Sequence, residues 1–236
     1  MSLPKLQTPE YSLVVPSTGE EIKYRPFLVK EEKLLLIALE SEEQNQINTA
    51  IQNLVKGCTF NKIGQKDTPI FDIEFSFLKI RSKSVGENST ISMTCPDDGK
   101  TKVDVNINYD DVEVQMTEDH STEVKITDEI TLVMRYPTLN DAMTESKDDI
   151  SDTEQVFKMV RDCMFEVHHN DDITNMIDVT DKEKDVFIGD MTSEQFASIQ
   201  VFFDTMPKLR HVIEFKNPKT KKKNEVLLEG LADFFD

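Results

Sequence analysis

The sequence lacks several residues and segments that mark other classes of protein. It has no tryptophan, and only seven of its 236 residues are glycine, so flexible hinges are few. The three cysteines, Cys58, Cys95 and Cys163, are widely spaced and odd in number, which is typical of reduced thiols rather than of a disulfide framework. No apolar run approaches the roughly 20 residues that cross a bilayer, and the N-terminus carries no apolar signal-peptide segment. We therefore expect a cytoplasmic protein that makes no membrane contact.

Positive charge is also scarce. Lys and Arg total 27 against 45 Asp and Glu, which gives a formal net charge of -18. This charge would repel a phosphate backbone everywhere except at a local basic patch, so we expect no nucleic-acid partner. The composition, 38% hydrophobic and 31% charged, is that of a globular protein. The length fits one large domain or two small ones.

Recognisable catalytic motifs are missing. The sequence contains no GxSxG elbow, no cysteine with an ordered histidine partner and no glycine-rich phosphate loop. Its carboxylates gather in acidic runs such as Asp148-Asp149 and Asp171-Asp172, which are typical of solvated faces. We therefore predict a protein that is not an enzyme and has no cofactor.

Two patterns have some similarity to metal sites. The run CPDDG, from Cys95 to Gly99, falls at the turn of a predicted hairpin, where zinc ribbons carry CPxCG. Because Asp98 takes the place of the second thiol and no other pair follows, we expect ribbon geometry without metal. His168-His169 lies at the end of a predicted helix, where the dipole attracts histidine and adjacent side chains diverge. The sequence thus predicts no metal site.

The densest apolar run lies between Asp67 and Glu87. Ile70, Ile73 and Phe77 recur at helical spacing, although the alternation in this stretch also fits a strand. Acidic residues come early in the run and basic residues late, as a helix dipole favours. We predict a largely buried helix of about four turns.

The rest of the chain alternates between the two periodicities. We predict a hairpin over 11–24, helices over 29–41 and 43–56, a hairpin over 89–107, and strands over 110–115 and 123–135. Beyond Pro137 we predict helices over 139–144, 152–167 and 192–206, a strand over 210–215 and a pairing return over 225–228. No internal repeat is apparent.

These elements predict an α+β fold. It would have a helical bundle-like core, an inserted antiparallel β-hairpin section that is degenerate zinc-ribbon-like, and a helical C-terminal half. The corresponding segments are 1–88, 89–136 and 137–236, or one continuous domain into which the β section is inserted.

Two stretches are candidates for contact with a partner. The basic turn over 216–224 would fit an acidic protein surface through Lys219, Lys221, Lys222 and Lys223, although a solvated turn explains these lysines equally well. Near the C-terminus, Leu231, Phe234 and Phe235 form an apolar set. Packing on the protein's own core is the favoured interpretation, and binding to another subunit is the alternative.

Several blocks of sequence resemble a known family. FDIEFSFLKIRSKSVGE, CPDDGK, FFDTMPKL and LLEGLADFF resemble the baseplate hub subunits of T4-like contractile-tailed bacteriophages. The resemblance implies a non-enzymatic hub component or hub assembly factor whose partners are other phage baseplate hub proteins. It would act in the host cytoplasm during assembly and in the virion tail baseplate. A tail assembly chaperone absent from the mature virion and a regulatory protein-binding module are the alternatives, and the oligomeric state stays open.

Overall fold

The computed structural model describes residues 6–141 and 151–234. The chain forms two compact units. Unit 1 consists of residues 1–115 and 208–236, and unit 2 of residues 116–207. Unit 1 is therefore discontinuous in sequence, and these bounds differ from the three predicted segments.

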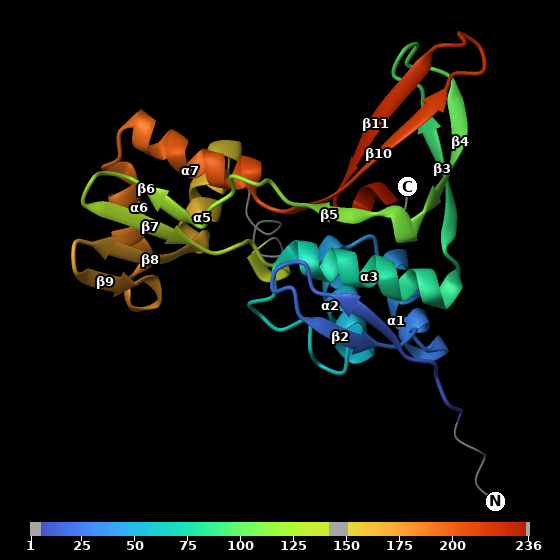
Figure 1. Cartoon of the computed structure of the whole chain (residues 1–236), viewed down its shortest axis with the longest axis horizontal. Coiled ribbons are helices and arrows are strands. Elements are labelled where there is room, and N and C mark those ends of the chain that lie inside the picture. The colour runs from blue at the N-terminus through green and yellow to red at the C-terminus, as the bar shows by residue number, and fades with distance from the viewer. Residues whose placement is uncertain (1–5, 142–150, 235–236) are drawn as a thin grey trace, which may run out of the picture. The chain divides into compact units, whose positions relative to one another are not determined.

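Unit 1 opens with a hairpin and three helices (Figure 1). The elements are β1 (Tyr11–Val14), β2 (Glu21–Tyr24), α1 (Val29–Glu40), α2 (Gln44–Cys58) and α3 (Ile70–Val85). A short turn closes the hairpin, where the Gly19 N–H donates to the Val15 carbonyl at 2.8 Å. Ser17 in this turn donates its N–H to the Asp72 carboxylate on α3 at 3.0 Å. The predicted hairpin and helices are confirmed here.

Helix α3 forms the centre of unit 1. Half of its 16 residues are buried, and it packs against α2 and against the strands β5 (Glu113–Gln115) and β10 (Lys208–Lys216). Phe71, Phe77 and Leu78 are at most 2% exposed. Because α3 is covered on more than one side, its apolar surface is wider than the stripe of a water-facing helix.

Two sheets complete unit 1. Strands β3 (Asn88–Thr94) and β4 (Lys102–Asn108) form an antiparallel hairpin, and β11 (Lys223–Glu229) joins β10 and β5 in the order β11-β10-β5. One-turn 3₁₀ helices follow β4 at Tyr109–Asp111 and β11 at Ala232–Phe234. The second of these buries Phe234 completely, so this residue is packed within unit 1.

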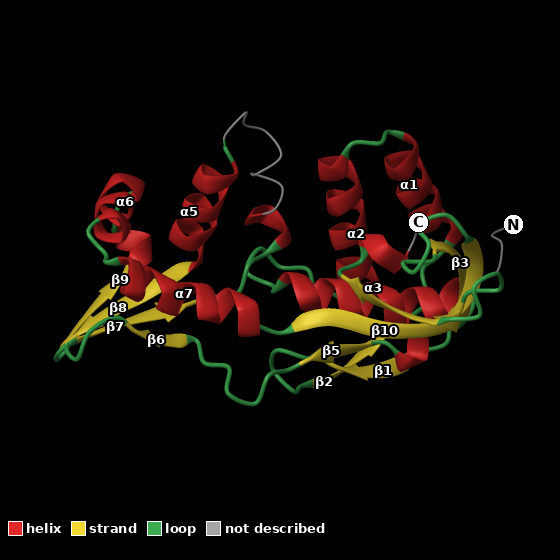
Figure 2. Ribbon diagram, turned by 90° about the horizontal axis from the view of Figure 1, so that it is seen from above, coloured by secondary structure: helices red, strands yellow, loops and turns green. Residues whose placement is uncertain are grey.

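Unit 2 combines a four-stranded meander with helices (Figure 2). Strands β6 (Glu123–Lys125), β7 (Ile130–Met134), β8 (Met164–His169) and β9 (Asp172–Asn175) pair in sequence order. The helices are α5 (Asp152–Cys163), α6 (Asp181–Gly189) and α7 (Ser193–Thr205), with a 3₁₀ turn at Met176–Asp178. Leu132, Cys163 and Ile199 are fully buried at their junction. The core of unit 2 therefore lies between the sheet and its helices.

The predicted fold class is wrong in three respects. The core is no helical bundle, because α1 buries only Ala38 and α3 packs on strands. The helix predicted over 152–167 ends at Cys163, since Met164–His169 pairs with both β7 and β9. The C-terminal half therefore alternates strands with helices, and β8 to β11 all lie in it. The ribbon-like hairpin is corrected below, and the helix predicted over 139–144 falls largely outside the described residues.

The structure also reveals a repeat that the sequence does not show. Each unit follows a hairpin with an arginine, Arg25 after β2 and Arg135 after β7. The guanidinium of Arg25 donates to the Pro26 carbonyl at 3.0 Å and to both oxygens of Glu31 at 2.9 and 2.6 Å. That of Arg135 makes the same contacts with Tyr136 at 3.2 Å and Asp141 at 2.8 and 3.0 Å.

The rest of this arrangement, which we call the arginine clasp, is shared as well. Each carboxylate accepts a backbone N–H at 2.7 Å, from Leu28 or from Thr138. Each arginine donates its own N–H to the carbonyl of a helix-ending cysteine, Cys58 at 3.0 Å or Cys163 at 2.8 Å. The helices that end there, α2 and α5, carry matching stripes: Ile51, Leu54, Val55 and Cys58 against Val156, Met159, Val160 and Cys163. The units therefore share one supersecondary motif despite different sequences.

A candidate protein-contact site

The tips of two hairpins in unit 1 meet and form the most distinctive polar cluster of that unit. The loop between β3 and β4 carries the CPDDG run, and the loop between β10 and β11 carries the lysine-rich turn. Figure 1 shows the two tips side by side, and hydrogen bonds that span about 120 residues of sequence join them. We call this assembly the double-hairpin tip.

Two aspartates and two asparagines hold the tip together. Asn217 donates its amide to Asp97 at 2.8 Å and to Asp98 at 3.1 Å. In return the Asp97 N–H donates to the Asn224 side-chain oxygen at 3.1 Å. The Thr220 hydroxyl donates to the remaining oxygen of Asp97. Asn217 is fully buried and Asn224 nearly so, whereas the contact between Thr220 and Asp97 is exposed.

Each loop is also fixed internally. Asp98 accepts from the N–H groups of Lys100 and Thr101 at 3.0 and 2.9 Å and from the Thr101 hydroxyl at 2.6 Å. On the facing loop, the Asn217 side-chain oxygen accepts the N–H groups of Lys219 and Thr220. Side chains that imitate turn hydrogen bonds favour one loop conformation. The tip is therefore a defined surface rather than a pair of loose loops.

The hydrogen bonds act on the acidity of the two aspartates. The Thr220 hydroxyl and the Asn217 amide hold the pKa of Asp97 below its usual range. The hydroxyl and N–H of Thr101 lower the pKa of Asp98 strongly. Both carboxylates therefore stay ionised well into the acidic range, and their charge is used inside the tip.

The predicted ribbon-like geometry is wrong. The loop that faces Cys95 supplies Asn217 and Thr220 where a second pair of thiolates would be needed, and the tip is closed by hydrogen bonds. Burial raises the pKa of the Cys95 thiol, which disfavours the thiolate that binds metal. Within residues 6–141 and 151–234, no group of three or more His, Cys, Asp or Glu is arranged to hold a metal ion.

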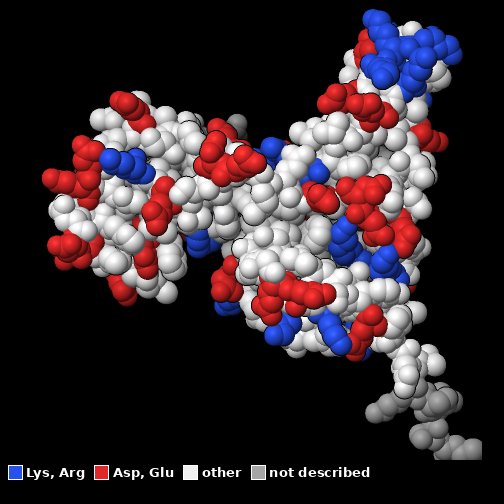
Figure 3. Space-filling view, in the orientation of Figure 1, with Lys and Arg blue, Asp and Glu red and all other residues white. Residues whose placement is uncertain are grey.

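Exposed lysines surround this acidic centre. The predicted partner-binding residues Lys219, Lys221, Lys222 and Lys223 all project into solvent, and the structure adds Lys100, Lys102 and Lys216. Figure 3 shows the resulting basic patch at the tip of unit 1. Lys216 lies directly opposite Lys223 in the β10–β11 register, a placement that like charges disfavour. An anionic partner would relieve that repulsion.

The charge of the whole chain makes this patch distinctive. Unit 2 contains 22 Asp and Glu against 7 Lys and Arg, whereas unit 1 contains 23 against 20. Five of the 20 basic residues of unit 1 fall within residues 216–223. The tip is therefore a concentrated cationic surface on a strongly acidic protein.

The apolar C-terminal set has a different position. Leu231 is 9% exposed and Phe234 is fully buried, and the Leu231 N–H donates to Glu74 on α3 at 3.0 Å. The Tyr109 hydroxyl donates to the Phe234 carbonyl at 3.4 Å. Leu231 and Phe234 thus pack within unit 1 in this conformation, and Phe235 lies outside the described residues. The tip lysines and the buried C-terminal residues do not form one site.

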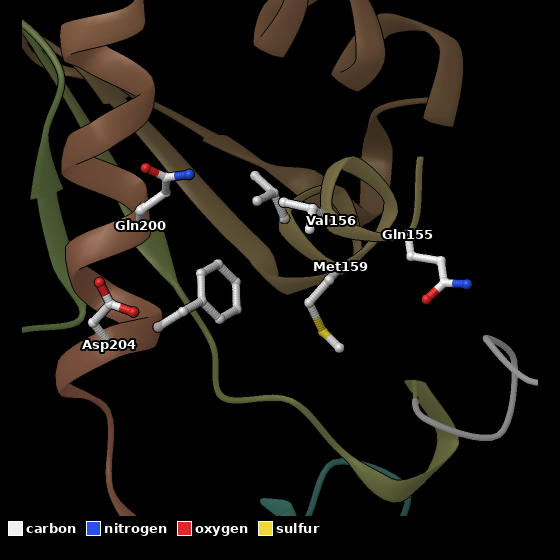
Figure 4. Close-up of a pocket in the computed structure, with 7 residues that line it drawn as sticks. Gln155, Val156, Met159, Gln200 and Asp204 are labelled. Atoms are coloured by element: carbon white, nitrogen blue, oxygen red, sulfur yellow. The ribbon is translucent and has the colours of Figure 1, made fainter. Parts of the chain in front are cut away.

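Unit 2 contains an open cavity of about 590 Å³ between α5 and α7 (Figure 4). Val156 and Met159 reach it from α5, and Gln200, Phe203 and Asp204 from α7. Among the described residues that line it, Asp204 alone is ionisable. General acid–base chemistry needs converging titratable groups, and this cavity does not bring them together.

The histidine pair does not form a site either. His168 and His169 lie on strand β8, where successive side chains point to opposite faces. His168 contacts Glu166 at 2.9 Å, whereas His169 lies 3.9 Å from Glu129. The predicted helix terminus at this place is wrong, because the backbone is paired on both sides.

The sequence predicted the tip lysines as partner-binding residues, but it did not predict the residues that join the two loops. Asn217, Thr220 and Asn224 have no motif that names Asp97 as their partner, because the two loops are far apart in the chain. The one sequence signal was the dipeptide Asn217-Pro218, which indicates a turn because an asparagine side chain can form turn hydrogen bonds.

Comparison with known proteins gives one match. A family model described as T4 bacteriophage base plate protein matches residues 8–236. No curated protein and no solved structure matches significantly. Among the described residues, no helix is long and apolar enough to span a bilayer.

Proposed function

Because the chain belongs to the family of T4 bacteriophage base plate proteins, we propose that it is a non-catalytic component or assembly factor of the baseplate hub. It acts by binding other baseplate proteins. Membership of this family supports a structural role in the phage tail baseplate. The assignment to the hub rests on the sequence blocks described above. The proposed mode of action rests on the exposed surface of the double-hairpin tip.

The observation that carries this proposal is the double-hairpin tip. Hydrogen bonds between its two loops fix the backbone that carries seven exposed lysines before any partner binds. Little backbone conformational entropy is therefore lost on binding. The surface fits an acidic face of a neighbouring protein, with attraction that accelerates encounter and fixes orientation. The wider chain is acidic and would repel nucleic acid.

A tail assembly chaperone is the second candidate function. The net charge of -18 favours it, because a strongly charged protein keeps an associated partner soluble. Mass spectrometry of purified mature tails distinguishes the two: a hub component stays in the particle, whereas a chaperone is found only with unassembled hub intermediates.

The test is a charge reversal at the tip. Phage that carry Lys221→Glu with Lys222→Glu should yield roughly tenfold fewer complete baseplates, counted by electron microscopy of infected-cell lysates, since contacts between close opposite charges fix orientation. The control reverses Lys23 and Lys62, whose side chains are 72% and 62% exposed in unit 1. This control changes the net charge by the same amount and should assemble normally.

Salt dependence supplies a second readout. Binding of the purified protein to isolated hub intermediates should weaken as ionic strength rises, because exposed charges are screened. Equal baseplate yields from the tip variant and the wild type would refute the role of the tip.

A further inference from the structure

Helix α1 exposes an apolar surface that unit 1 does not cover. Of its residues only Ala38 is buried, while five aliphatic side chains are exposed: Val29 by 81%, Leu34 by 63%, Leu36 by 52%, Ile37 by 51% and Leu39 by 47%. A helix that is apolar on most sides normally lies inside a protein. In Figure 2 α1 stands beside α2, which is its main packing partner.

Part of this surface is the wall of a groove. Leu34 and Ile37 line an open cavity of about 500 Å³ together with Thr49, Ala50 and Leu54 of α2. Glu31 is the one ionisable residue along it, and its carboxylate is paired with Arg25. A groove whose lining carries one carboxylate, already paired, fits the apolar face of a third helix.

The distribution of charged residues along α1 indicates which helix would pack in this groove. Lys30 and Lys33 are exposed near its start, whereas Glu40, Glu42 and Glu43 are exposed at its end and in the following turn. Lys30 and Glu40 lie ten residues apart on the helix, roughly 15 Å along its axis. Glu32, in the first turn, is partly buried. The exposed charge therefore runs from basic to acidic along the helix.

We infer that α1 pairs antiparallel with α1 of a second copy of this chain. An antiparallel neighbour sets the lysines of each copy beside the glutamates of the other, so both ends attract. A parallel neighbour would set like charges together. The two α1–α2 hairpins then form four packed helices, and the two-fold symmetry closes the assembly at a dimer. This surface is separate from the double-hairpin tip.

The first test measures association. Sedimentation velocity of the purified chain from about 1 to 100 μM should show a monomer–dimer equilibrium. Leu36→Glu with Leu39→Glu should raise the dissociation constant at least roughly 100-fold, since two half-buried leucines are lost from each copy. The control is Val186→Glu with Val201→Glu, whose parent residues are 56% and 57% exposed in unit 2, and it should dimerise normally.

The second test concerns orientation. Lys30→Glu with Lys33→Glu should weaken the dimer, because glutamates then face glutamates. Adding Glu40→Lys and Glu42→Lys to the same chain should restore it, as antiparallel packing requires. All of these side chains are exposed, and circular dichroism should show unchanged folding.

Two results would overturn the inference. One is a monomer at every concentration, which would leave the surface to a different protein. The other is a dimer that survives the leucine substitutions or is not recovered by the fourfold charge exchange.

Discussion

Replacing Glu74 by glutamine should stabilise the protein at neutral pH and not at acidic pH. Glu74 lies on α3 beneath the C-terminal segment, where its Oε1 accepts the Leu231 N–H at 3.0 Å. Burial, with a smaller contribution from the nearby Glu229, raises its pKa from the ordinary value of 4.5 to about 7. The folded protein therefore favours the neutral carboxyl.

The magnitude follows from linkage. Between the unfolded pKa of 4.5 and the folded pKa of about 7, the folded state holds a proton that the unfolded state has released. Stability consequently falls as pH rises through this window and is constant above it. At about 1.4 kcal/mol for each pH unit, the full loss is at most about 3.5 kcal/mol. The side chain is not completely shielded, so we expect roughly 1–2 kcal/mol.

Glutamine removes the charge and retains the acceptor for Leu231. The assay is urea denaturation followed by circular dichroism at pH 5 and pH 8. Glu74→Gln should unfold at higher urea than wild type at pH 8, and the two should approach one another at pH 5. Glu225→Gln, on the exposed face of β11, reports the general effect of removing one negative charge. An unchanged difference between Glu74→Gln and wild type at the two pH values would refute the reasoning.

Other substitutions test the clasp and a close backbone approach. Arg25→Met should destabilise unit 1 by about 2–4 kcal/mol, because Glu31 is left half-buried without its partner. Arg25→Met combined with Glu31→Gln should cost less than the sum of the two single changes in the same urea titration, and strict additivity would contradict a coupled pair. Gly64→Ala should cost about 2–3 kcal/mol, since Gly64 has φ +91° and its new Cβ would lie 2.9 Å from the Lys56 Cβ. Gly19→Ala, also at positive φ but with open space around it, should cost only about 1 kcal/mol, and equal losses in thermal melts would count against the crowding.

Local patterns were sufficient where one element carried its own signals. For α3, acidic residues early and basic residues late favour a helix rather than a strand, and the structure confirms the helix. Thr192 caps the start of helix α7: its hydroxyl accepts the Gln195 N–H, and the Gln195 side chain accepts the Thr192 N–H in return. Such a capping box can be recognised from four consecutive residues of sequence.

Sequence reasoning failed where a distant partner decided the outcome. The stretch after Cys163 continues a helical pattern, but Val167 pairs with Leu132 on one side and Thr174 on the other. Two ladders of backbone hydrogen bonds outweigh a modest helix preference. The arginine clasps were missed for a related reason, since each depends on the carbonyl of a cysteine about 30 residues further along.

By itself the sequence determined the charge of the protein, the positions of most of its hairpin turns and most of its helices, because these depend on residues a few positions apart. Its resemblance to phage baseplate hub proteins indicated the family that the comparison then showed. Only the tertiary structure decided that Asp97 meets Asn217, that Phe234 is buried and that α1 is left uncovered. Each of these depends on which surfaces meet after long loops close, and that choice is made by packing across the whole unit.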